Sequence, residues 1–96
     1  MHNDRERFLD YLRFEKRSSV HTVTAYEIDL RQFSDYLAEQ YQLTDLTEAT
    51  HMIVRSWIVS LMEAGIDPRS VNRKITTLRT LYRFLIKTGR MQRSPM

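Results

Sequence analysis

The sequence predicts a small all-α domain with four helices, and three observations support that prediction. Only two glycines and two prolines occur in 96 residues, so few positions interrupt a helix. Apolar residues recur at spacings of three and four in four separate segments, which places them on one face of a helix. Residues typical of helix ends flank these segments.

The first two helices are predicted over residues 4–16 and 20–40. In the first, Phe8, Leu9 and Leu12 share one face. Ser18 or Ser19 can cap the second helix by accepting a hydrogen bond from a backbone N–H. The second helix carries a longer apolar stripe, which a helix buries against its neighbours. Its members, at spacings of 3, 4, 3 and 4, are Val23, Tyr26, Leu30, Phe33 and Leu37.

A third helix is predicted over residues 51–64. Either Thr47 or Thr50 can cap its start, and Gly65 suits the left-handed residue that ends a helix. Its apolar face consists of Val54, Trp57, Ile58 and Leu61.

The fourth helix has the clearest start signal and is predicted to run to about residue 87. Asp67 is the expected cap, Pro68 occupies the first turn, and Gly89 follows the end. Phe84 falls outside the apolar stripe, and we expect it to pack on the chain ends or on a partner. The stripe consists of Val71, Ile75, Leu78, Tyr82 and Leu85.

Composition excludes several classes of protein. The length fits one domain, residues 1–96. There is no cysteine, and His2, His21 and His51 lie far apart, so we expect no metal site and no cofactor. No apolar run approaches the roughly 18–20 residues of a membrane span. We therefore expect a cytoplasmic protein without a membrane partner.

Charge is segregated along the chain. Residues 1–67 hold all 12 carboxylates and 7 basic side chains, whereas residues 68–96 hold 8 basic side chains and no acid. Ion pairs within this last segment cannot offset the repulsion among its cations. The segment therefore favours an anionic partner, although a solvated basic face is the simpler alternative.

The predicted polar face of the fourth helix fits nucleic acid. Long cations alternate there with short hydroxyls, so phosphates can approach closely while arginine reaches a base edge. The start of this helix also offers free N–H groups to a phosphate oxygen. The face consists of Arg69, Arg73, Thr76, Thr77 and Thr80, with Asn72 and Arg83 at its edges.

Two stretches and one spacing resemble a known family. They are SVHTVTAYEIDLRQFSDYL, DPRSVNRKITTLRTLYRFLIKTGRMQRSP and the spacing Trp57–Leu61–Gly65. Together they resemble the N-terminal core-binding, SAM-like domain of tyrosine recombinases, including the Xer-type, phage and transposon integrases. The resemblance covers residues 4–95 and implies a four- or five-helix orthogonal bundle. It also implies that the second and fourth helices lie against the major groove of a recombination half-site.

The resemblance assigns DNA-contact candidates by position. At the start of the second helix they are His21, Thr22, Thr24 and Ala25, and on the fourth helix they are Arg69, Ser70, Arg73, Lys74 and Thr77. The predicted polar face independently contains Arg69, Arg73 and Thr77. Thr22 and Ser70 could instead serve only their own first turns, and His21 could be an ordinary surface histidine.

The same resemblance implies that catalysis belongs to a second domain outside this chain. We expect no catalytic residue here, because none of the five tyrosines has a recognisable set of histidine and arginine helpers. The parent protein would break and rejoin DNA through a phosphotyrosine in a bacterial, nucleoid-associated setting. The expected partners are double-stranded DNA and other recombinase protomers, and the isolated domain is expected to be monomeric.

Two other functions remain open from the residues alone. A helix-turn-helix regulator would use the third and fourth helices and give the start of the second helix no role. A helical protein-interaction module would bind an acidic partner and not duplex DNA. An enzyme is disfavoured, because no constellation of acid, base and nucleophile is visible.

Overall fold

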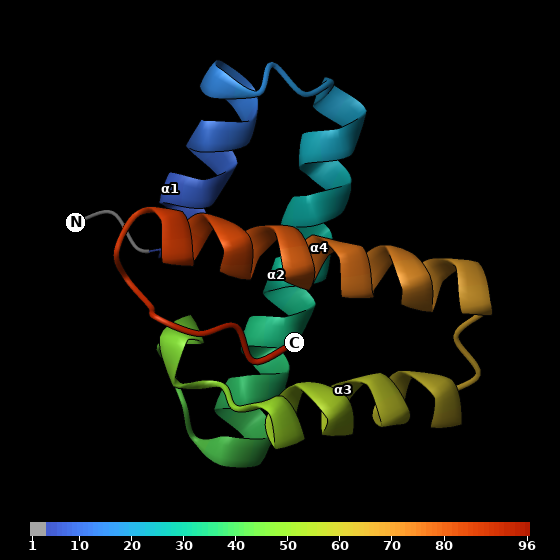
Figure 1. Cartoon of the computed structure of the whole chain (residues 1–96). Coiled ribbons are helices and arrows are strands. Elements are labelled where there is room, and N and C mark those ends of the chain that lie inside the picture. Colours follow the sequence, from blue (N-terminus) through green and yellow to red (C-terminus); the bar gives the residue numbers. More distant parts are fainter. Residues whose placement is uncertain (1–3) are drawn as a thin grey trace.

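The computed structural model describes residues 4–96, and this part of the chain is all-helical (Figure 1). The predicted all-α class is therefore confirmed. The elements, in chain order, are α1 (Asp4–Asp10), η1 (Tyr11–Glu15), α2 (Val20–Tyr41), η2 (Leu46–Glu48), α3 (His51–Glu63) and α4 (Pro68–Lys87).

The first predicted helix changes character halfway. After α1 the chain widens into η1, a π-helical turn in which the Lys16 N–H donates to the Tyr11 carbonyl five residues back. Arg17 then takes a left-handed backbone conformation with φ of 50°, which ends the helix and reverses the chain. The predicted buried residues Phe8, Leu9 and Leu12 are all in the core.

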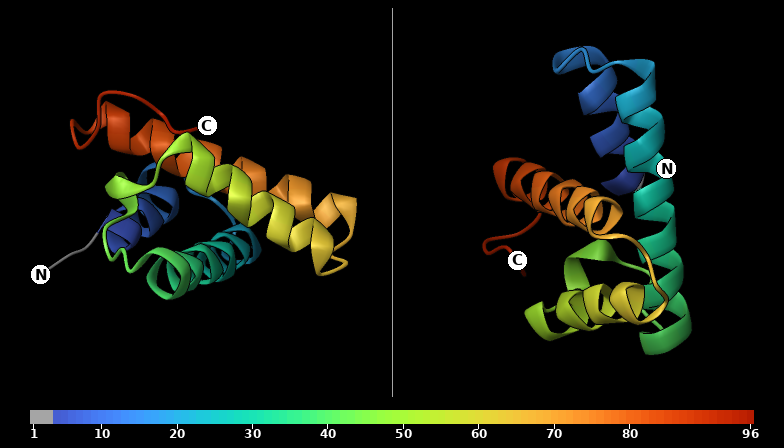
Figure 2. Two further views of the ribbon diagram at one scale, coloured as in Figure 1. Left: turned by 90° about the horizontal axis from the view of Figure 1, so that it is seen from below. Right: turned by 90° about the vertical axis from the view of Figure 1, so that its right-hand side faces the viewer.

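The helices form two antiparallel hairpins that cross. In Figure 1, α1 and α2 run side by side in opposite directions, and so do α3 and α4. Helix α4 packs on both α2 and α3 and crosses α2 near its middle (Figures 1 and 2). The first turns of α2 and those of α4 therefore extend in different directions from one crossing.

The core is built from the predicted stripes. Val23, Leu30, Phe33 and Leu37 of α2 are buried, and the Phe33 ring lies 4.9 Å from the Trp57 ring of α3, centroid to centroid. The buried Tyr82 hydroxyl donates to the Leu46 carbonyl at 2.8 Å. This bond ties α4 to η2, the short turn between α2 and α3.

Helix α4 buries a second stripe that the sequence prediction missed. Besides Val71, Leu78, Tyr82 and Leu85, it buries residues three and four apart on the neighbouring side of the helix. Ile75, predicted to be buried, is only half-buried. The additional buried residues are Lys74, Thr77, Leu81 and Phe84.

Phe84 belongs to this second stripe and packs at the amino-terminal end of the chain. Its ring lies 5.6 Å from the Phe8 ring and 4.8 Å from the Tyr11 ring. Contact with a chain end was one of the two places expected for it. The carboxyl-terminal residues contact the start of α3, where the His51 Nδ1 atom lies 3.0 Å from the carbonyl oxygen of the buried Pro95.

Candidate nucleic-acid interface

The start of α2 is fixed by Ser19. Its side chain accepts a hydrogen bond from the Thr22 backbone N–H at 3.1 Å, and its hydroxyl donates to the Thr22 hydroxyl at 3.0 Å. This arrangement satisfies one of the backbone donors left free at a helix start. His21, Thr22 and Thr24 are exposed around this turn, whereas Ala25 is half-buried.

The start of α4 is capped by Asp67. Its carboxylate accepts hydrogen bonds from the Ser70 backbone N–H and from the Ser70 hydroxyl, both at 3.0 Å. These bonds hold the pKa of Asp67 below its ordinary value, so the cap carries a negative charge at neutral pH. The predicted phosphate position at this helix end is therefore partly occupied by the protein's own carboxylate, while Arg69 beside it is exposed.

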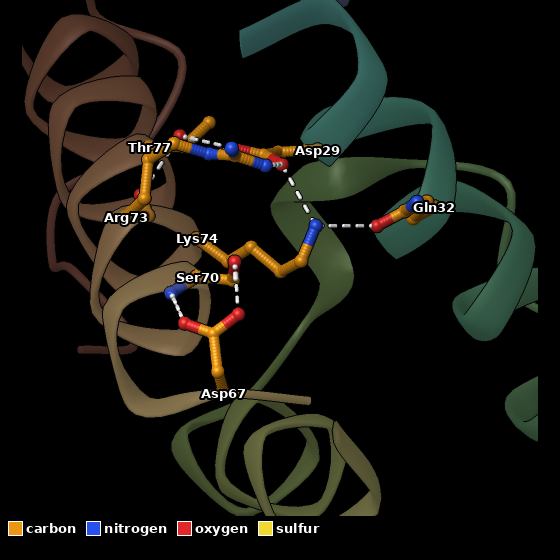
Figure 3. A network of polar contacts seen from close by, with 7 residues as sticks. All are labelled: Asp29, Gln32, Asp67, Ser70, Arg73, Lys74 and Thr77. Atoms are coloured by element: carbon orange, nitrogen blue, oxygen red, sulfur yellow. Dashed lines mark hydrogen bonds and ion pairs between the residues drawn. The ribbon is translucent and has the colours of Figure 1, made fainter. Parts of the chain in front are cut away.

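A polar network lies where α4 crosses α2, and its centre is the fully buried carboxylate of Asp29 (Figure 3). One oxygen accepts from Arg73 Nη2 at 2.7 Å and from Lys74 Nζ at 2.9 Å. The other accepts from Arg73 Nε at 3.2 Å and from the Thr77 hydroxyl at 2.8 Å. Lys74 Nζ also donates to the Gln32 side chain at 2.7 Å.

This network corrects the position predicted for Thr77 and shows where Lys74, another contact candidate, lies. Thr77 was placed on the open polar face of α4, but it is fully buried and bonded to Asp29. Lys74 is 5% exposed, with its ammonium group between Asp29 and Gln32. Neither side chain presents a polar atom to a ligand in this conformation, because each uses its polar group inside the protein.

Arg73 remains accessible although it belongs to the network. Its Nε and Nη2 atoms bind Asp29, while 45% of its side chain is exposed. Its Nη1 atom has no hydrogen-bond partner among residues 4–96. Because guanidinium has five N–H donors, Arg73 can hold Asp29 and still donate to an external acceptor.

The network lies between the contact candidates at the start of α2 and those on α4, where the two helices cross. Ala25 lies four residues before Asp29 in α2, which is about one helical turn. Arg73 and Thr77 reach Asp29 from the first three turns of α4. The exposed starts of both helices therefore flank the same buried anchor.

The exposed side of α4 is basic and has no acid. Three cations of the carboxyl-terminal segment are paired with carboxylates elsewhere: Arg73 and Lys74 with Asp29, and Arg90 with Asp4 at 2.9 Å. By contrast, Arg69, Arg79 and Arg83 are exposed and have no ion-pair partner among residues 4–96. The fold thus neutralises part of the predicted basic segment and leaves the outer side of α4 available to an anion.

The Asp29 pKa predicts how stability depends on pH. Burial alone would raise the pKa of this carboxyl, but the hydrogen bonds from Arg73, Lys74 and Thr77 outweigh it and hold the pKa below the ordinary 3.8. In the window between the two values the unfolded chain binds more protons, so stability falls as pH falls. We expect urea midpoints to hold down to about pH 5 and to drop below about pH 4. An Asp29→Asn variant that shows an equally large acid drop would contradict this assignment.

Asp29 is the residue of this region that the sequence prediction missed. The sequence contained a signal, because Asp29 lies three residues after Tyr26 and four before Phe33, on the side of α2 that is buried. A carboxylate at such a position needs cationic partners. Lys74 and Arg73 are those partners, but their distance in sequence concealed the pairing.

No other chemistry is assembled in the described part of the chain. Among residues 4–96 no three His, Cys, Asp or Glu side chains gather as a metal site would require, and His2 lies outside the described residues. None of the helices in this range is long and apolar enough to cross a membrane. Of the tyrosines, Tyr82 is buried with a pKa raised by that burial, and the Tyr36 and Tyr41 hydroxyls bond to Ser56.

Comparison with known proteins identifies relatives over most of the chain. The family model for the phage integrase N-terminal SAM-like domain matches residues 6–89. A tyrosine recombinase XerC of Oceanobacillus iheyensis is 41% identical over 88 residues, which cover 92% of this chain and 28% of the relative. A XerC of Chlorobaculum parvum is 40% identical over 97 residues, 95% of this chain and 29% of the relative.

A XerD-type relative shows the same coverage. The tyrosine recombinase XerD of Rickettsia bellii is 37% identical over 89 residues, covering 93% of this chain and 28% of the relative. The chain thus spans less than a third of the length of these curated relatives. No solved structure shows significant similarity to it. With the family model matched over most of its length, this chain belongs to the phage integrase N-terminal SAM-like domain family of tyrosine recombinases.

Proposed function

We propose that this chain is the DNA-binding arm of a tyrosine recombinase and holds the major-groove side of a recombination half-site. The observation that carries the proposal is the crossing of α2 and α4 at Asp29. It joins the exposed start of α2 to a side of α4 that bears exposed cations and no acid. Phosphate contacts from such a surface supply affinity, while side chains that reach the groove supply selectivity.

The candidate residues then divide into two roles. His21, Thr22, Thr24 and Arg69 contact DNA directly from the exposed first turns of the two helices, with Ala25 close to the groove. Ser70 serves chiefly the Asp67 cap.

The residues of the buried network act differently. Lys74 and Thr77 position α4 against α2 through Asp29 and do not touch DNA. Arg73 takes both roles, because its guanidinium holds Asp29 and is still 45% exposed.

The rest of the recombinase supplies the chemistry in this proposal. The named relatives are tyrosine recombinases about three times the length of this chain. The described tyrosines lie in packed or hydrogen-bonded positions, so we assign no catalytic residue, cofactor or metal to this domain. The domain on its own is monomeric, meets other protomers only within the full assembly on DNA, and acts in the bacterial cytoplasm at the nucleoid.

Replacing Thr22 and Thr24 together by alanine tests the α2 part of this interface. We expect the chain to bind a 20-base-pair duplex with roughly micromolar affinity and a log–log salt slope near −4 to −5. The double variant should bind roughly tenfold more weakly, because two hydroxyl contacts are lost. Fluorescence anisotropy of labelled duplex measures both quantities.

Thr44→Ala is the matched control, because Thr44 is exposed beyond the opposite end of α2. Its affinity should equal that of the unmodified chain. Unchanged binding by the Thr22→Ala, Thr24→Ala variant would contradict the two-helix interface and favour a helix-turn-helix regulator. A chain that binds no duplex even at low salt would contradict DNA binding altogether and favour an acidic protein partner.

A further inference from the structure

A groove of about 440 Å³ opens between η1, the start of α2 and the second half of α4. None of the ten residues that line it is acidic, three are cations and five carry a hydroxyl group. Of the cations, Lys16 directly follows η1, whereas Arg83 and Lys87 belong to α4. None of the three was among the contact candidates assigned from the resemblance, although Arg83 stands at the edge of the polar face predicted for the fourth helix.

Two of the positive charges in this groove lie near one aromatic ring. The Lys16 and Lys87 ammonium groups lie 6.0 and 5.5 Å from the centre of the same Tyr11 ring. Arg83 lines the same groove and has no ion-pair partner among residues 4–96. With three cations and no acid along its lining, the groove carries net positive charge, which an anion bound there would offset.

The groove also offers a hydrogen-bond donor beside the cations. The Thr22 hydroxyl accepts a bond from Ser19, and its own proton has no acceptor among residues 4–96. The Thr80 hydroxyl donates to the Thr76 carbonyl instead. The lining therefore offers a phosphate group one neutral donor and three charged ones, the kinds of donor that bind phosphate oxygens.

We propose that this groove binds a backbone phosphate of the DNA duplex, so that the footprint extends beyond the predicted residues to Lys16, Arg83 and Lys87. The inference rests on the DNA-binding function proposed above. Thr22 links the two surfaces, because it lines the groove and also belongs to the exposed start of α2. A strand that follows the first turn of α2 thus passes directly over the groove.

Removal of the three groove cations tests the proposal. The probe is a labelled 20-base-pair duplex, and the variant carries Lys16→Gln, Arg83→Gln and Lys87→Gln. All three residues are exposed, so the variant should keep the fold and thermal midpoint of the unmodified chain. We expect its affinity to fall roughly tenfold, with a salt slope shallower by about 0.9 because one phosphate contact is lost.

The matched control removes the same charge elsewhere. Arg7, Arg55 and Arg93 are exposed and do not line the groove, so their joint replacement by glutamine should weaken binding much less. Equal losses in the two triple variants would overturn the groove site, because only net charge would matter. The single variant Arg83→Gln tests the same groove with less change to the protein.

Amide shifts distinguish this site from other outcomes. Duplex should shift the amides of Ser18, Thr80 and Arg83 in the unmodified chain and not in the groove variant. If duplex shifts only residues 20–25 and 69–73, the DNA-binding function stands and the groove site is overturned. If inorganic phosphate shifts the groove amides and duplex does not, the groove takes a free anion and this proposal is wrong. If no duplex binds at all, both proposals fail.

Discussion

The Asp29→Asn variant should lose about 3–5 kcal/mol of unfolding free energy, because it leaves a buried cation without its counter-ion. Asparagine has nearly the same shape, so packing stays the same while the charge disappears. Lys74, 5% exposed, would keep only Gln32 as a neutral partner. A loss of this size is a large fraction of the roughly 5–15 kcal/mol typical of a domain. Urea unfolding at pH 7 measures it.

Two variants control this prediction. Asp35 is an exposed aspartate on the same helix, and Asp35→Asn should change stability by less than about 0.5 kcal/mol. In the double variant Asp29→Asn, Lys74→Met both buried charges are gone, so the loss should be well below the sum of the two single losses. Additive losses would show that Asp29 and Lys74 do not act as a pair.

Arg73→Ala is expected to weaken duplex binding by about 1–3 kcal/mol, roughly 5- to 150-fold, if the guanidinium reads a base edge. The reason is its double use: Nε and Nη2 are held by Asp29, and the exposed remainder is thereby oriented away from the core. A side chain positioned in advance loses less conformational entropy on binding. Anisotropy titration measures the effect at a temperature where the amide spectrum shows the variant to be folded.

The controls separate binding from stability. Arg69 is exposed and unpaired among residues 4–96, so Arg69→Ala should weaken binding to a smaller extent and leave the unfolding midpoint unchanged. Arg73→Ala should lower both, because Asp29 loses one of its two cations. Unchanged affinity of folded Arg73→Ala protein would remove α4 from the proposed interface at this position.

Helix ends were the features most easily predicted from the sequence, because they depend on local chemistry. Asp67 caps α4 and Pro68 starts it, and Gly89, with φ of 80°, follows its end. Ser19 and Thr50 were each among the expected caps and occupy those positions. The π-helical turn η1 was not predicted, since nothing local in residues 11–15 distinguishes it from an ordinary helix.

The buried side of α4 was harder to predict from the sequence, because its second stripe contains polar residues. Helical periodicity is recognised from the spacing of apolar side chains, so the polar residues Lys74 and Thr77 are not identified as buried. Their burial depends on Asp29, more than 40 residues earlier. Only the crossing of α2 and α4 brings these residues together. The position of that crossing cannot be inferred from the helical periodicity of a single sequence.

Only part of the candidate site could be predicted, again because some of it depends on contacts between residues far apart in sequence. The candidates at the start of α2 came from the family resemblance, whereas Arg69 on α4 also follows from helix phase. The structure leaves His21, Thr22, Thr24 and Arg69 open to solvent, while Ala25 is half-buried. The groove near Lys16, Arg83 and Lys87 could not be predicted, because it depends on where η1 packs against α4. The basic segment was visible in the sequence, but which of its charges the protein neutralises internally was not.

An amide NMR titration of this chain with a 20-base-pair duplex, at low and then moderate salt, decides whether the exposed starts of α2 and α4 bind DNA. We expect shifts at residues 20–25 and 69–73, at the exposed starts of α2 and α4, together with Ser18, Thr80 and Arg83 of the groove, and all of them should fade as salt rises. Shifts confined to α3 and α4, or no shifts even at low salt, would contradict this expectation.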